Sequence, residues 1–174
     1  CLAGKLMKKN DIEIDVVFCS VLVRAIETAK LAILEMNQKH LWNKKNELIM
    51  TCNKSLNERD YGDLVGLNKK ETAKKFGEKQ VHIWRRSYDI SPPGGESLKE
   101  VVRRVDPYFS RVIESELNKS KNVLVVAHGN SLRAILIKID LYKPEAISKI
   151  EIPTGNPLQI KYKNGKLINA EFLF

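Results

Sequence analysis

Twice in this sequence, a short apolar run rich in β-branched residues passes directly into helical spacing. The run Val123–Val126 is continuous, which predicts a strand buried on both faces, and apolar residues then recur at three- and four-residue steps from Leu132 to Ile139. The segment EIDVVFCS, which ends at Ser20, predicts a second buried strand, and residues 21–36 predict a helix with one apolar face. Such alternation predicts an α/β domain with a mostly parallel sheet.

Further elements follow the same pattern. Residues 47–52 predict a third short strand, and residues 53–66 are polar and predict a loop. Residues 69–88 are helical in character and strongly basic. A long amphipathic segment follows from Leu98 to about Leu117, and we expect Pro107 to kink or divide it.

The end of the chain predicts a β-hairpin. Residues 157–174 contain two strand-like runs on either side of Asn164-Gly165, a pair that is the strongest short signal for a hairpin turn. We expect this hairpin to add an antiparallel edge to the sheet. With 174 residues, 43% of them apolar, and no repeats or low-complexity linkers, the chain is expected to form one domain with a substantial core.

His128 is placed where the first of these strands ends and the next helix begins. His128, Gly129 and Asn130 therefore lie near unpaired backbone N–H groups and a helix dipole that favour an anion. Arg24 lies in the first turn after the other strand. Because ligands of such folds bind beyond the carboxyl ends of the strands, both side chains should point into one crevice. A guanidinium, an imidazole and helix amides at one point suit a phosphoryl group.

Taken one at a time, these residues also have ordinary structural interpretations. A lone histidine after a strand is more often structural than catalytic, and Arg24 alone could be a surface charge. Glu58 could be solvated or paired with Arg59, and the arginines that follow Trp84 could cover an exposed helix face. Pattern and composition by themselves therefore indicate an α/β domain with an anion site.

The net charge of +9 is spread along the chain, which favours an anionic partner without specifying nucleic acid. A nucleic-acid binder is disfavoured because few aromatics interleave with the basic run and no RNA or DNA motif occurs. The three cysteines share no metal-binding or disulfide spacing, so we expect a reducing, cytoplasmic setting. No apolar run is long enough for a membrane helix.

Four motifs carry a specific resemblance. They are, in chain order, SVLVRAIETA (20–29), LNERDYGDLVG (56–66), AHGNSLR (127–133) and IPTGNPL (152–158). Together they closely resemble the cofactor-dependent phosphoglycerate mutases of the histidine phosphatase superfamily, and KKETAKKFGE and WRRSYDISPPGGESL fit the compact bacterial type. The resemblance covers essentially the whole chain and implies a three-layer α/β sandwich.

The resemblance also implies roles for individual residues. Glu58 resembles the proton donor and acceptor for the substrate hydroxyl, a task that needs a carboxyl group. His128 resembles the residue that stabilises the phosphoryl group during transfer, and Arg24 its phosphate-binding partner. Gly129 and Asn130 would add hydrogen bonds beside them.

A second set of positions is implied to hold the remainder of the substrate, namely Arg59, Asp60, Tyr61, Lys69, Arg85 and Arg86. Lys69, Arg85 and Arg86 resemble a clamp on the remaining carboxylate and phosphate of a three-carbon phosphoglycerate. A small polyanion has little apolar surface and must be held by charge-assisted hydrogen bonds. Asp60 is unexpected in this set, because a further carboxylate would repel the substrate unless it turns away.

The implied reaction is the interconversion of 2-phosphoglycerate and 3-phosphoglycerate in glycolysis and gluconeogenesis. It proceeds through a phosphohistidine primed by 2,3-bisphosphoglycerate and requires no metal. Small phosphorylated three-carbon acids would be the partners, with no nucleic acid and no membrane, and the assembly could be a homodimer or a homotetramer. A phosphatase of the same superfamily and a non-catalytic anion-binding fragment are the alternatives.

The nucleophile of the family is missing from the printed sequence. In the family it is a histidine in an Arg-His-Gly triplet after the first strand, and the sequence contains no such triplet. Neither His40 nor His82 replaces it. Leu2 and Leu6 already have helical spacing, so we expect residues 1–174 to be a single mutase-like domain without its first strand and nucleophile loop. These would occupy roughly four dozen preceding residues.

Overall fold

Three parallel strands form the centre of the fold. The structure is a computed structural model that describes residues 1–147 and 150–174, apart from the side chains of Lys69 and Lys70. Strands β1 (Val16–Cys19), β2 (Thr51–Cys52) and β3 (Val123–Val126) pair in the order β2-β1-β3. The predicted α/β fold with a mostly parallel sheet is thereby confirmed.

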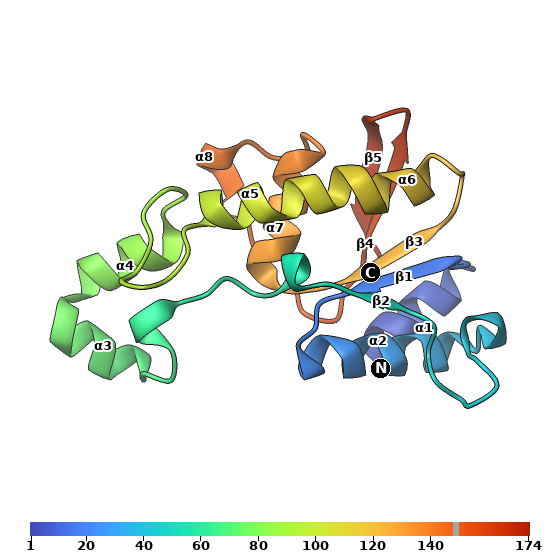
Figure 1. Cartoon of the computed structure of the whole chain (residues 1–174), viewed down its shortest axis with the longest axis horizontal. Coiled ribbons are helices and arrows are strands. Elements are labelled where there is room, and N and C mark those ends of the chain that lie inside the picture. The colour runs from blue at the N-terminus through green and yellow to red at the C-terminus, as the bar shows by residue number, and fades with distance from the viewer. Residues whose placement is uncertain (148–149) are drawn as a thin grey trace.

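Helices cover both faces of this sheet (Figure 1). Helices α1 (Leu2–Lys9) and α2 (Val23–Met36) pack together on one face, and α5 (Leu98–Tyr108) and α7 (Gly129–Lys138) pack together on the other. Each helix buries one apolar stripe against the strands, at a gain of about 1.5–3 kcal/mol for each large side chain. The result is the three-layer sandwich that the resemblance implied.

Successive residues of β1 belong to different cores because side chains alternate along a strand. Val17 and Cys19 are buried beneath α1 and α2, whereas Phe18 is buried beneath α5 and α7. The strand that precedes Arg24 is therefore fixed from both sides, and so is the position at which α2 starts.

β3 packs on both faces, as predicted, with Leu124 and Val126 against the core beneath α1 and α2 and Val123 and Val125 against the core beneath α5 and α7. Its four residues are nevertheless only half-buried, and β3 pairs with β1 alone among the described strands. Its other edge adjoins a largely apolar cavity of about 510 Å³ that Met7, Ala25 and Ile135 also line. An apolar run predicts a strand whose side chains favour burial, but it does not show whether other described residues bury them.

The long amphipathic segment is divided near Pro107, as predicted. Helix α5 contains Pro107 and ends at Tyr108, a π-helical turn occupies Phe109–Ile113, and α6 spans Glu114–Leu117. Proline lacks an N–H and its ring crowds the preceding turn, so a change in helical hydrogen bonding beside it is expected. The three parts nevertheless follow one direction in Figure 1.

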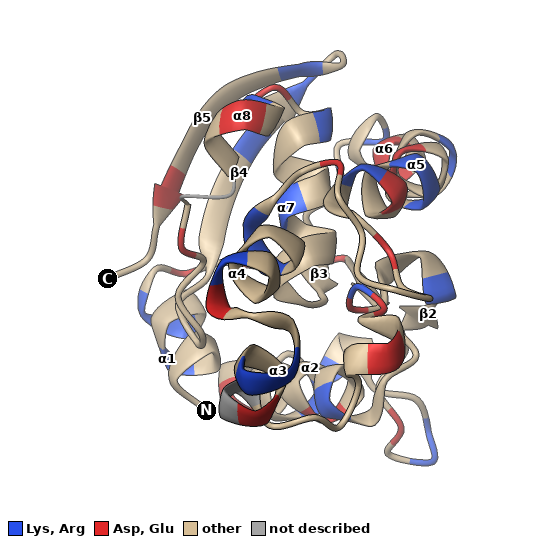
Figure 2. Cartoon of the chain, turned by 90° about the vertical axis from the view of Figure 1, so that its left-hand side faces the viewer, with Lys and Arg blue, Asp and Glu red and all other residues tan. Residues whose placement is uncertain are grey.

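Helices α3 (Lys69–Phe76) and α4 (Glu78–Arg86) lie at one end of the long axis (Figure 1). They enclose a small core of their own, in which the rings of Phe76 and Trp84 meet edge to face at 5.2 Å between centroids. Figure 2 looks onto this end, with both helices in front of α7. Short 3-10 turns, at Lys39–Leu41, Lys54–Leu56 and Gly62–Leu64, and the short helix α8 (Pro144–Ile147) complete the helical elements of the described residues.

The hairpin is confirmed, but its expected place in the parallel sheet is wrong. Strands β4 (Leu158–Lys163) and β5 (Lys166–Phe172) pair only with each other in the described structure, around Asn164 and Gly165 with φ of 52° and 74°. The hairpin packs by its side chains instead. Tyr162 of β4 donates a hydrogen bond to Glu114 at 2.8 Å.

The third strand is shorter than predicted. Only Thr51 and Cys52 of residues 47–52 form β2, because Leu48 makes an isolated antiparallel bridge to Trp42 instead. No helix among the described residues has the length and apolar character needed to cross a membrane.

Candidate active site

His128 lies where β3 gives way to α7, and it is the N-terminal cap residue of that helix. Its side chain is buried, with Nε2 2.7 Å from Oγ of Ser20 and Nδ1 3.3 Å from Nε of Arg24. Arginine Nε can only donate, so Nδ1 accepts, and Nε2 carries the proton that it donates to Ser20. The predicted convergence of Arg24 and His128 is therefore present.

The environment of His128 favours the neutral imidazole. Burial lowers its pKa below the ordinary value of 6.5, and the positive charge of Arg24 lowers it further, whereas Glu58 acts in the opposite direction. A neutral ring keeps a fixed tautomer, so the Ser20 contact holds one nitrogen as a donor.

Glu58 reaches the same place from the loop after β2. Its Oε1 accepts hydrogen bonds from Nδ2 of Asn130 at 3.0 Å and from the backbone N of Asn130 at 3.3 Å. The backbone N of Arg59 donates to the same oxygen at 2.7 Å. A carboxylate at the start of a helix is stabilised by the orphan N–H groups there. The first turn of α7 therefore holds the acid next to His128.

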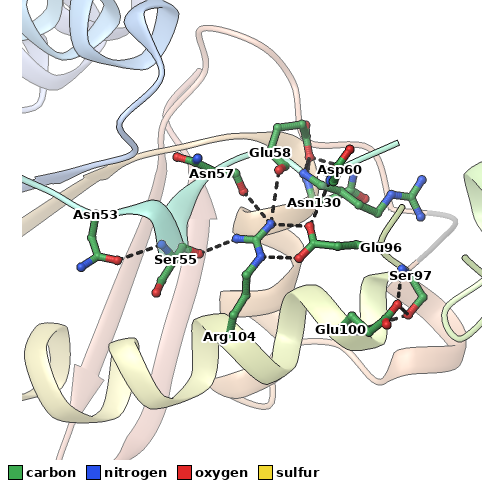
Figure 3. A network of polar contacts seen from close by, with 11 residues as sticks. Asn53, Ser55, Asn57, Glu58, Asp60, Glu96, Ser97, Glu100, Arg104 and Asn130 are labelled. Atoms are coloured by element: carbon green, nitrogen blue, oxygen red, sulfur yellow. Dashed lines mark hydrogen bonds and ion pairs between the residues drawn. The ribbon is translucent and has the colours of Figure 1, made fainter. Parts of the chain in front are cut away.

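Arg104 of α5 holds the loop that carries Glu58 (Figure 3). Its guanidinium donates to the backbone carbonyls of Ser55 at 2.7 Å, Asn57 at 3.1 Å and Glu58 at 3.2 Å. It also binds both carboxylate oxygens of Glu96, at 2.8 and 2.9 Å. One guanidinium can donate to several acceptors, so Arg104 supplies the loop carbonyls with hydrogen bonds that a regular helix or strand would otherwise provide.

Glu96 extends this network to Asp60. Its Oε2 accepts a hydrogen bond from the backbone N of Asp60 at 3.0 Å. Burial alone would raise the pKa of Glu96, but the hydrogen bonds from Arg104 and Asp60 hold that pKa below its ordinary value. The side chain of Asp60 is exposed and accepts from the backbone N of Gly62 at 2.8 Å. The structure thus turns this carboxylate toward its own loop.

A pocket of about 230 Å³ opens beside Asn130. It is lined by four arginines and four other residues, namely Arg59, Arg85, Arg86, Arg133, Tyr61, Ser87, Leu98 and Asn130. We call it the outer pocket. Among the described residues that line it there is no Asp or Glu. A pocket with this lining suits a ligand that carries more than one negative charge.

Tyr61 organises two of these arginines. The guanidinium carbons of Arg59 and Arg85 lie 4.6 and 5.7 Å from the centre of its ring. Arg59 also donates through Nη2 to the backbone carbonyl of Arg85 at 3.3 Å. The Nε atoms of both arginines are buried without a hydrogen-bond partner in the described structure. Such donors cost about 1–3 kcal/mol each while they stay unpaired, so a ligand oxygen that reached either Nε would be favoured.

The structure thus gathers most of the residues singled out from the sequence into two adjoining places. Arg24, Glu58, His128, Gly129 and Asn130 surround the predicted place of the reaction, which we call the reaction centre, and Arg59, Tyr61, Arg85 and Arg86 line the outer pocket. Asp60 stands outside that lining. Lys69 is the first residue of α3, and its side chain falls outside what the structure describes.

Sequence reasoning missed three contributors, namely Ser20, Arg104 and Arg133. Ser20 and Arg133 lie inside recognised motifs, so proximity to Arg24 and His128 could have singled them out. Arg104 lies outside the recognised motifs, and residue type alone does not separate it from its exposed neighbour Arg103. The described residues contain no cluster of three or more His, Cys, Asp or Glu that could hold a metal ion.

Comparison with known proteins identifies the class. The family model of the histidine phosphatase superfamily, branch 1, matches residues 2–171, and the chain belongs to this superfamily. A 2,3-bisphosphoglycerate-dependent phosphoglycerate mutase from Methylocella silvestris is 45% identical over 169 residues, which cover 97% of this chain and 79% of that protein. The resemblance to this mutase family is thereby confirmed, and it is a family of isomerases.

Solved structures agree on the fold. A mycobacterial glucosyl-3-phosphoglycerate phosphatase superposes with a TM-score of 0.74 at 20% identity, covering 98% of this chain and 80% of that one. The alpha-ribazole phosphatase from Shigella flexneri also gives 0.74, at 22% identity, covering 99% and 79%. At these identities the likeness shows the fold alone.

The lowered pKa of His128 predicts an NMR titration midpoint below 6.5 for its imidazole. On acidification the imidazole of His128 takes up its proton at a higher pH in the unfolded chain than in the folded protein. The free energy of unfolding should therefore be highest above the pKa of the unfolded state and should decrease as the pH falls through the pKa of the folded state. Spectra of His128→Asn would assign the resonance. A midpoint at or above 6.5 would contradict the buried, Arg24-facing environment.

Arg104→Lys should lower the free energy of unfolding by about 1–3 kcal/mol, because an ammonium group cannot serve three carbonyls and Glu96 together. Urea unfolding measures the change. Arg103→Lys, one residue earlier on the exposed side of α5, is the matched control and should stay within about 0.5 kcal/mol. Equal effects of the two substitutions would remove Arg104 from its role as the anchor of the loop.

Proposed function

We propose that this protein interconverts 2-phosphoglycerate and 3-phosphoglycerate through a phosphohistidine primed by 2,3-bisphosphoglycerate. The observation that carries the proposal is the outer pocket, in which four arginines lie next to Asn130 and Glu58. The names of relatives at 43–48% identity support the same reaction.

Two anion sites distinguish a mutase from a simple phosphatase. A phosphatase must hold only the phosphoryl group that is transferred, whereas a mutase must hold its intermediate at both ends while it reorients. Arg24, His128 and the amides of α7 supply the first site, and Arg85 and Arg86 supply the second. The resemblance adds Lys69 to the second site.

Glu58 is assigned the proton transfer at the substrate hydroxyl. Its Oε1 is committed to Asn130 and Arg59, while Oε2 lies 3.9 Å from the position that a Cβ on Gly129 would occupy. The hydrogen bonds to Oε1 therefore orient Oε2 as well. Positioned acid–base catalysis typically contributes 10²–10⁴-fold to a rate.

The lining of the outer pocket fits 2,3-bisphosphoglycerate. The buried Nε atoms of Arg59 and Arg85 have no partner in the described structure, and the lining described there contains no carboxylate that would repel a polyanion. When bound, the bisphosphoglycerate supplies a phosphoryl group to the accepting histidine. Arg24 and His128 orient that group, and Arg85 and Arg86 hold the opposite end.

We assign none of the three histidines of the printed sequence as the phosphoryl acceptor. Of its three histidines, His40 contacts the carbonyl of Ile14 and His82 is exposed on α4. The edge of β3 away from β1 pairs with no described strand, and the adjoining cavity reaches Arg24 and His128. A parallel strand added there would deliver its carboxyl end to the reaction centre. A protein consisting of residues 1–174 alone would bind anions without forming the phosphohistidine.

A phosphatase of the same superfamily is the second candidate, since the structural neighbours include phosphatases. At identities of 20–22% these structures support a shared fold but not a shared reaction. The outer pocket favours the mutase, because hydrolysis of one phosphoryl group needs no second anion site.

The test is conversion of 3-phosphoglycerate to 2-phosphoglycerate by the protein at its native length, with 2,3-bisphosphoglycerate in trace amounts. Glu58→Gln should lower turnover by about 10²–10⁴-fold and leave phosphate binding largely intact, since it keeps the shape and removes the proton transfer. Glu13→Gln, which alters an exposed carboxylate before β1, is the control and should be silent.

Two results would overturn the proposal. Release of inorganic phosphate without isomerisation would indicate the phosphatase, and ligand binding without either reaction would indicate a binding protein. Normal turnover in Glu58→Gln would remove Glu58 from the acid–base role.

A further inference from the structure

We propose that Arg133 is a specificity-determining residue, because its guanidinium bridges the reaction centre and the outer pocket and so selects ligands with a second anionic group. The inference rests on the proposed function and adds to it a residue outside the set that the family resemblance implied.

The backbone holds one side of this guanidinium in place. Nε and Nη2 of Arg133 donate to the carbonyl of Ile150 at 3.3 and 2.8 Å. The carbonyl orients the fork, so little side-chain entropy is lost when a ligand binds to the other side. Nη1 makes no hydrogen bond to the described residues and is the donor left for a ligand.

The second side faces the reaction centre. A Cβ added to Gly129 would lie 3.2 Å from Nη1 of Arg133 and 3.9 Å from Oε2 of Glu58. The space that Gly129 leaves open is thus bordered by a donor from Arg133 and by the oxygen assigned to proton transfer. A ligand whose hydroxyl meets Glu58 would place its next group within reach of Nη1.

Arg133 also belongs to the outer pocket, which it lines with Arg85 and Arg86. It stands three residues after Asn130 on α7, so the two share a helix face. Asn130 binds Glu58 at the reaction centre, and Arg133 continues that face into the outer pocket. Figure 2 shows Lys and Arg segments of α4 in front of those of α7 at this end of the molecule.

The electrostatic surroundings agree with this geometry. Burial lowers the pKa of Arg133, and the nearby charge of Arg86 lowers it further, while Glu58 raises it. Arginine nevertheless stays charged in proteins. Its positive charge is therefore under-compensated before a ligand binds, and a carboxylate or second phosphate would relieve the repulsion from Arg86.

The experiment compares two ligands that differ in one anionic group. 3-Phosphoglycerate and glycerol 3-phosphate both carry a phosphate, but only the first has a carboxylate. Calorimetric titration of the native-length protein gives the ratio of their dissociation constants. Arg133→Gln should reduce the preference for 3-phosphoglycerate by at least about tenfold, as expected for the loss of a charge-assisted hydrogen bond.

Two further variants separate recognition from folding. Arg133→Lys keeps the charge without the fork and should restore part of the preference, whereas Arg111→Gln, which changes an exposed arginine, should leave it unchanged. A preference in Arg133→Gln equal to that of the unchanged protein would overturn the assignment, even if both ligands bound more weakly. Absence of the preference in the unchanged protein itself would instead overturn the proposed function, and the assignment with it.

Discussion

The guanidinium of Arg104 makes five hydrogen bonds, of which three join α5 to the loop that carries Glu58 and two bind the carboxylate of Glu96. That loop contains only short 3-10 turns, so its backbone carbonyls would otherwise depend on solvent. Glu96 forms an ion pair with Arg104 and accepts a hydrogen bond from the backbone N of Asp60, so Asp60 is held in place as well. The position of Glu58 next to α7, and with it the boundary between reaction centre and outer pocket, depends on Arg104 together with the hydrogen bonds that Asn130 donates to the Glu58 carboxylate.

The sequence predicted the parts of the site that follow from local pattern. Arg24 and His128 were expected together because each follows a buried strand, and parallel strands end at one edge of a sheet. The partners that fix the site are distant in the chain, such as Ser20 for His128 and Arg104 for Glu58, which are separated by 108 and 46 residues. Periodicity places Arg104 nearer than Arg103 to the buried stripe of α5, but it does not show which distant loop the Arg104 guanidinium binds.

Two features of the fold differ from expectation for a related reason. The edge of β3 away from β1 pairs with no described strand, so the residues of β3 are only half-buried. The hairpin does not occupy that edge and forms a separate sheet. The apolar pattern of a strand predicts that its side chains are buried, and the tertiary structure decides which elements bury them. The open edge lies beside Arg24 and His128, where the proposed reaction needs its accepting histidine.

The central claim is that the outer pocket holds the far end of a bisphosphorylated intermediate. The most direct measurement pairs single-turnover labelling of the accepting histidine with steady-state mutase rates, in the native-length protein and in a double variant, Arg85→Ala with Arg86→Ala. The account predicts that mutase turnover falls much more than phosphohistidine formation, since the intermediate escapes or is hydrolysed before it reorients. Equal losses in both would mean that the two arginines serve the first phosphoryl transfer or the fold, which would contradict the claim.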